Sequence, residues 1–252
     1  MPQWTWTAAC RRGTAHAAAG ERRQDAFRIA ACDRLGGCIA LAACDGAGSA
    51  SHGGEGASLA AWTLAERARS RLNDGITCTP DMDEAVAWLE LARLRVATAA
   101  FRRGLPVGSL ATTAILVLSN GTSTTVAHIG DGAVAGRETG SGEWLPLSWP
   151  EHGEYAATTF FLTDTEPRVR VSRHNGRLDR LAVMTDGLER LALDFVARRP
   201  HAPFLDAISA PVAGGGPGLN RPLSSALAEF LDSEKVCSRT DDDKTLLLAA
   251  LV

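Results

Sequence analysis

Three apolar runs of this chain end at the same dipeptide, an aspartate followed by a glycine. The pairs are Asp45-Gly46, Asp131-Gly132 and Asp186-Gly187. A carboxylate at the end of a strand offers oxygen ligands to a hard cation, and the glycine lets the backbone come close to a ligand. Two further acidic segments, Gln24-Asp25 and Asp241-Asp242-Asp243, complete the set. Together these positions predict a polycarboxylate metal centre.

Each pair also has a simpler interpretation, because aspartate-glycine is a common turn dipeptide. Asp74-Gly75 follows a helical pattern without a clear strand after it, so we interpret it as a turn. Asp131-Gly132 stays open between a metal ligand and a hairpin turn with AVAGRE as the return strand. Asp45-Gly46 precedes a small-residue loop and Asp186-Gly187 precedes a predicted helix, and such junctions display side chains at the end of a sheet.

Gathered carboxylates need cations nearby, because like charges repel one another. Mg²⁺ and Mn²⁺ prefer oxygen ligands, and two such ions roughly 3.5 to 4 Å apart can share a carboxylate and a bridging water. Water bound in this way becomes a nucleophile near neutral pH. The residue types therefore indicate metal-assisted hydrolysis.

The composition excludes several other classes of protein. The 252 residues are 45% hydrophobic and 22% charged, with a formal net charge of -3, so no overall basic field attracts nucleic acid. No apolar stretch reaches the roughly 18 to 20 residues that span a bilayer, and the first residues lack the pattern of a secretory signal. We expect a cytoplasmic protein without membrane contact. The six cysteines form no C-x-x-C pair, so we expect reduced, partly buried thiols.

Two long segments have helical periodicity. From Gly56 to Leu72 and from about Asp81 to Arg103, apolar residues recur every three or four positions, and Asp81-x-x-Glu84 resembles a capping box. Further helices are predicted for the LERLALDFVARR segment after Asp186-Gly187 and for Pro222 to Leu231. The glycine-rich residues 214–218 are predicted to be a flexible loop, since they are not followed by the Lys-Ser/Thr pair that ends a phosphate-binding P-loop.

The strands are predicted between and around these helices. Thr112 to Leu118 and Thr124 to Ile129 flank Asn120-Gly121, which is a strong hairpin pattern, and the terminal TLLLAALV run is a further strand. Strands and helices that cluster in blocks favour an α+β fold with antiparallel sheets. No domain boundary is evident, so we expect one domain over residues 1–252.

The order of the motifs along the chain narrows the function. It runs through GTAH (Gly13–His16), QDAF (Gln24–Phe27), DGAGSA (Asp45–Ala50), a Thr-Thr-Ala strand, Gly-Asp-Gly, Thr-Asp-Gly-Leu and DDKT (Asp242–Thr245). From about Cys10 to Val252 this order resembles the PP2C-type metal-dependent serine/threonine protein phosphatases, in their bacterial branch. The resemblance implies a four-layer αββα sandwich, in which two antiparallel sheets pack face to face with helices outside.

The same resemblance implies a set of ligands. Asp25, Asp45 with the backbone carbonyl of Gly46, Asp186 and Asp242 would hold two Mn²⁺ or Mg²⁺ ions, and Asp131 matches a motif that contributes to a third, weaker site in bacterial relatives. The implied activity is hydrolysis of phosphoserine and phosphothreonine in proteins by a metal-bridging hydroxide. The implied partner is a phosphorylated protein, a cognate serine/threonine kinase or one of its targets.

Some residues depart from the family pattern. Gln24 stands where a glutamate is frequent, and it can hydrogen-bond a metal-bound water. A phosphate-binding arginine usually precedes this motif, and the candidates here are Arg22, Arg23 and, as a substitute, His16. These departures motivate one alternative, a catalytically degenerate domain that binds phosphoproteins or regulates a partner. A hydrolase of small phosphorylated metabolites is a third interpretation.

Overall fold

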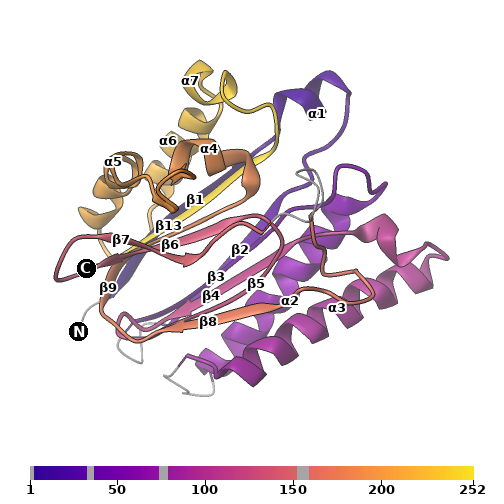
Figure 1. Cartoon of the computed structure of the whole chain (residues 1–252), viewed down its shortest axis with the longest axis horizontal. Coiled ribbons are helices and arrows are strands. Elements are labelled where there is room, and N and C mark those ends of the chain that lie inside the picture. Colours follow the sequence, from indigo (N-terminus) through magenta and orange to yellow (C-terminus); the bar gives the residue numbers. More distant parts are fainter. Residues whose placement is uncertain (1–2, 33–36, 74–78, 152–158) are drawn as a thin grey trace.

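Two β-sheets pack face to face in the computed structural model, which describes residues 3–32, 37–73, 79–151 and 159–252 (Figure 1). The six-stranded sheet has the order β12 (Gly218–Leu219), β1 (Trp4–Arg11), β13 (Lys244–Leu251), β9 (Leu178–Met184), β6 (Ala133–Glu138), β7 (Trp144–Ser148). The five-stranded sheet has the order β2 (Ala26–Cys32), β3 (Cys38–Cys44), β4 (Ala114–Ser119), β5 (Thr124–Ile129), β8 (Arg170–His174). All neighbours within these two sheets are antiparallel except β1 and β12.

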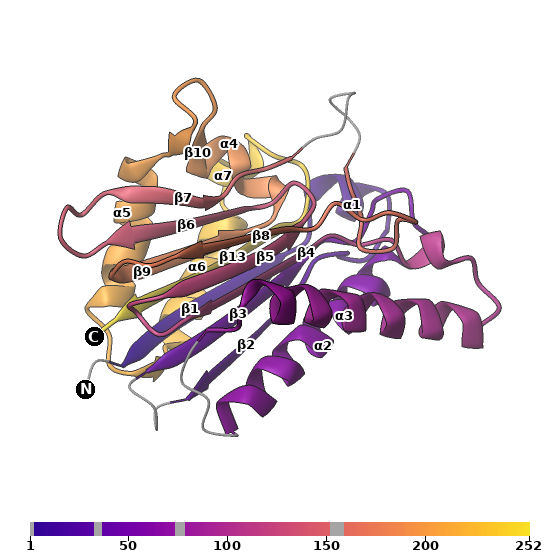
Figure 2. The same ribbon diagram turned by 60° about the horizontal axis from the view of Figure 1, so that its bottom comes forward.

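Helices cover the outer face of each sheet. The long helices α2 (Gly53–Asn73) and α3 (Met82–Arg102) lie against the five-stranded sheet (Figure 2). The other sheet carries α5 (Ala202–Ala213), α6 (Arg221–Leu231) and the short α7 (Glu234–Cys237). The remaining short helices are α1 (Thr14–Ala18), η1 (Val107–Leu110), η2 (Asp186–Leu188) and α4 (Glu189–Ala192). The predicted four-layer αββα sandwich is thus confirmed.

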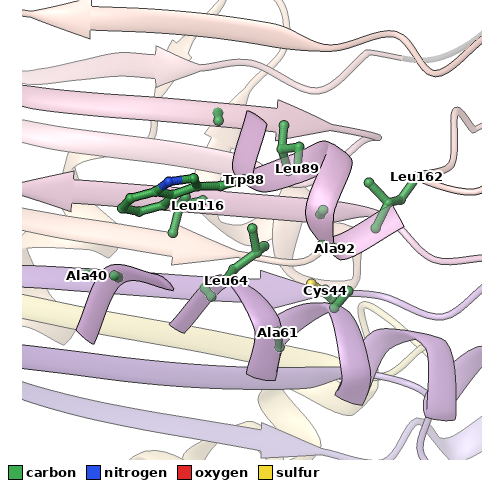
Figure 3. Close-up of a cluster of buried hydrophobic side chains, with 14 of the residues drawn as sticks. Ala40, Cys44, Ala61, Leu64, Trp88, Leu89, Ala92, Leu116 and Leu162 are labelled. Atoms are coloured by element: carbon green, nitrogen blue, oxygen red, sulfur yellow. The ribbon is translucent and has the colours of Figure 1, made fainter. Parts of the chain in front are cut away.

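The central strands are apolar on both faces because each face meets another layer. In β3, Ala40, Ala42 and Cys44 lie in the cluster under the helices, while Ile39 and Leu41 lie in the cluster between the sheets. In Figure 3, Leu64 of α2 and Trp88 of α3 lie over this sheet beside Leu116 of β4. Side chains alternate across a strand, so an unbroken apolar run fits only a strand buried on both sides.

Most predicted elements are present. The helix predicted from Asp81 is α3, and Asp81 caps it by accepting a hydrogen bond from the backbone N–H of Glu84 at 2.8 Å. The reciprocal half of the capping box is absent there, since the Glu84 carboxylate binds Arg71 instead. The hairpin between β4 and β5 is confirmed, with Gly121 at a φ of 82° in the turn.

One prediction about local structure is wrong. The segment after Asp186-Gly187 is no continuous helix, since α4 ends at Ala192 and a ribbon of β10 (Leu193–Asp194) and β11 (Arg199–Pro200) follows. The Asp194 carboxylate accepts hydrogen bonds from the N–H groups of Val196 and Ala197, which offers the backbone a turn in place of a helix. Sequence reasoning also missed α5.

At Asp131-Gly132, which the sequence left open between a metal ligand and a hairpin turn, the structure excludes the hairpin. β5 and β6 belong to different sheets, so the chain crosses from one layer to the other at this point. Gly130, with a φ of 113°, permits the change of direction. AVAGRE does form a strand, β6, but it pairs with β7 and β9.

Three further expectations concern the cysteines, the turn at Asp74-Gly75 and membrane-spanning helices. Cys32 and Cys38 lie opposite each other on β2 and β3, as expected if they do not share one strand. Asp74-Gly75 lies outside the described residues. Within the described part of the chain, no helix is long and apolar enough to cross a membrane.

Candidate metal centre

The acidic residues singled out in the sequence lie at strand ends that meet. Asp25 directly precedes β2 and Asp45 directly follows β3, and these strands are antiparallel with Ala26 opposite Cys44. In the other sheet, Asp186 lies two residues after β9 and Asp242 lies two residues before β13, whose pairing places Leu246 opposite Met184. Antiparallel neighbours bring the end of one strand beside the start of the next. This topology gathers carboxylates from distant parts of the chain.

A small cavity of about 160 Å³ lies among these residues. Its lining includes Asp45, Gly46, Asp131, Asp186, Asp242 and His16. Asp25 does not line the cavity; it is buried and lies beside Asp45. The structure therefore brings together every residue that the sequence predicted as a ligand.

Asp25 is held by two hydroxyl groups. Its Oδ2 accepts hydrogen bonds from Thr185 at 2.8 Å and Thr245 at 2.6 Å, while Oδ1 is buried without a partner in the described structure. Burial raises the pKa of Asp25 to about 6, although the neighbouring Asp45 and the hydrogen bonds from the two threonines oppose the shift. One oxygen is thus fixed and the other is available for a ligand.

Asp45 and Asp186 carry the strongest electrostatic conflict. Burial raises the pKa of Asp45 well above its ordinary value, and the charges of Asp25 and Asp186 add to the increase. Burial also raises the pKa of Asp186 to about 7, followed by repulsion from Asp131 and Asp242. A bound cation would relieve this repulsion, as expected of carboxylates that ligate a metal.

The donor set fits hydrated ions rather than a closed protein cage. No three His, Cys, Asp or Glu side chains in the described ranges are already arranged around a single point that would hold an ion. Mg²⁺ keeps several water ligands and takes only one or two carboxylates at many sites. A cluster that shares its carboxylates between ions and leaves the other positions to water matches this arrangement.

The acidic triplet before β13 divides into two roles. Asp242 lines the cavity, and burial raises its pKa. Asp243 is buried and accepts hydrogen bonds from the N–H groups of Gly13 at 2.6 Å, Gln24 at 2.5 Å and Asp25 at 3.3 Å. Asp243 therefore ties the N-terminal segment to β13, and Asp242 is the member that faces the cavity.

The glycines of the Asp-Gly pairs are required by close backbone contacts. A Cβ on Gly46 would lie 2.2 Å from the carbonyl carbon of Gly53, and one on Gly187 would lie 2.0 Å from the carbonyl oxygen of Asp243. Contacts this short leave no room for a side chain. The glycines thus allow the loops that carry Asp45 and Asp186 to pack against their neighbours.

The departures from the family pattern have structural explanations. With its NH₂ group facing the loop, Gln24 donates to the carbonyl oxygens of Gly46 and Ala47 at 3.0 and 2.9 Å. Arg23 donates to the backbone oxygens of Asp25 and Cys10 at 3.1 and 3.2 Å, which is a structural role. Among the candidates for binding phosphate, only His16 lines the cavity, where its Nδ1 lies 3.0 Å from Asp243 Oδ1.

Two residues at the site were missed by sequence reasoning. The hydroxyl of Thr159 donates to Asp131, and Glu189 lines the adjoining cavity of about 400 Å³ together with Asp186. Burial raises the pKa of Glu189 to about 9, and repulsion from Asp186 and Asp131 adds to it. Glu189 follows Asp186 by three residues at a predicted helix start, which was the available signal. Thr159 had none.

Comparison with known proteins agrees with this fold and identifies the family. A family model described as protein phosphatase 2C matches residues 12–232, so the chain belongs to the protein phosphatase 2C family. It is 35% identical over 250 residues to the serine/threonine-protein phosphatase 3 of Escherichia coli (strain K12), covering 98% of both chains. The predicted resemblance to the bacterial branch of metal-dependent phosphatases is confirmed.

Solved structures share the fold at low sequence identity. A bacterial serine phosphatase matches with a TM-score of 0.67 and 14% identity, over 97% of this chain and 96% of that one. RsbX in complex with magnesium matches with a TM-score of 0.61 and 15% identity, over the full length of both chains. These likenesses concern the arrangement of the elements.

Proposed function

We propose that this chain hydrolyses phosphoserine and phosphothreonine in proteins with the help of divalent Mn²⁺ or Mg²⁺. One observation carries the proposal: Asp45 lies half-buried beside Asp25, Asp186 and Asp242, and desolvation together with the charges of these neighbours raises its pKa well above the ordinary value. Carboxylates from four strand ends would not be gathered in this way unless a cation balanced them.

The ligands that we propose are those at the cavity. Asp25, Asp45, Asp186, Asp242 and the backbone carbonyl of Gly46 would hold two ions. When bound, such ions neutralise charge on the phosphoryl oxygens and lower the pKa of water. We assign a third, weaker site to Asp131, which lines the cavity beside Asp186.

Other residues would position these ligands. Thr185 and Thr245 orient Asp25 through its Oδ2, and Asp243 holds the backbone of Gln24 and Asp25 in place. His16 is fixed by Asp243 and borders the cavity, so it is the side chain best placed to face the substrate on that side. Ligands fixed before metal and substrate arrive lose less entropy on binding.

The biological setting is proposed from the same reasoning. The substrate is a phosphoprotein, either a cognate serine/threonine kinase or one of its targets, and the place of action is the cytoplasm. Residues 1–252 act as a single domain, because Trp4, Leu41, Ile115, Val183 and Leu247 from both sheets share one buried cluster. Neither sheet alone would keep that cluster buried.

A degenerate, non-catalytic domain is not favoured. The relative with 35% identity is named as a phosphatase, and the departure at Gln24 is accounted for by its contacts with the loop of Gly46. The carboxylates that we propose as ligands also lie close together, since Asp45, Asp186 and Asp242 line the cavity and Asp25 lies beside Asp45.

The test measures turnover and metal binding together. The protein is assayed on a phosphothreonine peptide with Mn²⁺, with Mg²⁺ and with EDTA, and Mn²⁺ uptake is followed by calorimetry. We expect turnover only with added metal. Asp45→Asn should lose both activity and tight Mn²⁺ uptake, because it removes charge from the centre of the cluster. Asp83→Asn, an exposed aspartate on α3, is the matched control and should change neither.

Two results would contradict the proposal. Robust turnover in EDTA would exclude a metal-dependent reaction. Capture of phosphopeptide without turnover, in protein that binds Mn²⁺ normally, would favour a binding module instead.

A further inference from the structure

A groove of about 480 Å³ lies on the helical layer that covers the six-stranded sheet. Its walls come from α4, α5, α6 and α7, which group together on that side of the molecule (Figure 1). The floor is made of half-buried apolar side chains that rest on the core: Leu191, Phe204, Ile208 and Phe230. The rings of Phe204 and Phe230 face the same space, with centroids 6.4 Å apart.

The rim of this groove is positively charged. Arg190, Lys235 and Arg239 line it and are exposed, and within the described residues none of them forms a salt bridge. Arginines elsewhere, such as Arg11 and Arg95, are paired with carboxylates. Among the described residues, no aspartate or glutamate lines the groove. Unpaired cations around an apolar floor attract a ligand that is both acidic and apolar.

The groove continues toward the metal centre. Arg190 and Arg239 also line the cavity of about 400 Å³ that contains Asp131, Asp186 and Asp242. The two spaces therefore share a wall. A polypeptide whose phosphorylated residue reaches the carboxylates can extend over these arginines into the groove.

We propose that this groove binds the segment of a phosphoprotein that flanks the phosphorylated residue, and that it selects a bulky apolar side chain with acidic neighbours. This inference rests on the proposed function and names its substrate class. The apolar floor would accept the anchor side chain, and the rim would pair with the acidic residues. The larger groove beside Gly48 is less suited to this selection, because Glu21 and Glu55 line it together with Arg22, Arg23 and Arg28.

The experiment compares three phosphothreonine peptides at low ionic strength with Mn²⁺. The first is a short core, the second extends the core on both sides with leucine or phenylalanine among glutamates, and the third replaces the glutamates with lysines. We expect the highest kcat/KM for the acidic extension. Lys235→Glu should reduce the preference for acidic over basic peptide by roughly threefold to tenfold, since it removes one attraction and adds one repulsion. Added salt should weaken the preference in the parent protein.

Arg69→Glu is the matched control, because Arg69 is an exposed cation on α2, in the opposite helical layer. It should leave the preference unchanged. Lys235→Gln provides a milder variant, expected to lie between the parent and Lys235→Glu, in case the charge reversal impairs folding. Equal kcat/KM for all three peptides, or a preference that both Lys235 variants retain, would overturn the assignment of the groove.

The outcome for the groove is separable from that for the activity. If the parent protein does not hydrolyse even the core peptide with metal present, the proposed function fails. If it hydrolyses the core peptide but ignores the extensions, only the groove assignment fails. A dimer in sedimentation that Lys235→Glu dissociates would assign the groove to a second copy of the chain and would also overturn the inference.

Discussion

Replacing Asp186 with asparagine should stabilise the metal-free protein, and the gain should grow with pH. Burial and the charges of Asp131 and Asp242 raise the pKa of Asp186 from its ordinary value of 3.8 to about 7. The folded chain thus holds this proton more tightly than the unfolded chain does. The stability that protonated Asp186 contributes is complete below the unfolded pKa and is lost as the pH rises through about 7.

The magnitude follows from the size of this shift. One pKa unit corresponds to about 1.4 kcal/mol, so the carboxylate destabilises the folded state by about 4 kcal/mol at pH 8. Since only part of that cost is present at pH 5, about 3 kcal/mol of it develops between pH 5 and pH 8. Asparagine keeps the shape without the charge, and should remove the pH-dependent cost.

The assay is urea unfolding in EDTA at pH 5 and pH 8, followed by the fluorescence of the six tryptophans. The control is Glu166→Gln, which neutralises an exposed carboxylate away from the cavity and should shift neither curve. Mn²⁺ should stabilise the parent more than Asp186→Asn, because the ion neutralises the same repulsion. A variant that is no more stable than the parent at pH 8, or a gain equal at both pH values, would refute this reasoning.

Two further predictions concern the backbone around the site and helix α3, which covers the five-stranded sheet. Gly187→Ala should lower the free energy of unfolding by about 1 to 3 kcal/mol and weaken Mn²⁺ uptake in calorimetry, because the added Cβ would meet the carbonyl oxygen of Asp243. Gly140→Ala is the control and should be neutral, because a Cβ there has open space. Equal stability of the two variants would contradict this prediction. Asp81→Ala should lower the free energy of unfolding, measured in urea, by about 1 kcal/mol without changing turnover, because the N–H of Glu84 loses its cap. Asp81→Asn should retain most of the stability, since its side-chain oxygen can still accept this hydrogen bond. An unchanged urea midpoint for Asp81→Ala would show that the cap is dispensable.

The local elements of the fold were largely predictable. The periodicities that predicted α2 and α3 reflect faces that pack on a sheet, and the Asn120-Gly121 hairpin depends on residues adjacent in sequence. The apolar spacing after Asp186-Gly187 is helical, but the helix predicted there is interrupted because Asp194 stabilises a turn within it. Two local preferences compete there, and packing decides between them.

The candidate site was predictable as a list of residues but not as an arrangement. The recurrence and order of the acidic motifs placed Asp25, Asp45, Asp186 and Asp242 in one set; the last three line one cavity, and Asp25 lies beside Asp45. Asp131 could not be separated from a hairpin turn, because the crossing from β5 to β6 depends on which sheet each strand joins.

By itself, the sequence determined which residues are available for the chemistry and that long apolar strands must be buried on both faces, since residue type and alternation follow directly from chain order. Only the tertiary structure decided how these residues interact. It placed Asp243 under the N-terminal segment and Asp242 at the cavity, and it joined α4 to α7 around a cationic groove. The physical reason is that burial, repulsion between carboxylates and shared walls arise from contacts between residues far apart in the chain, which no local pattern specifies.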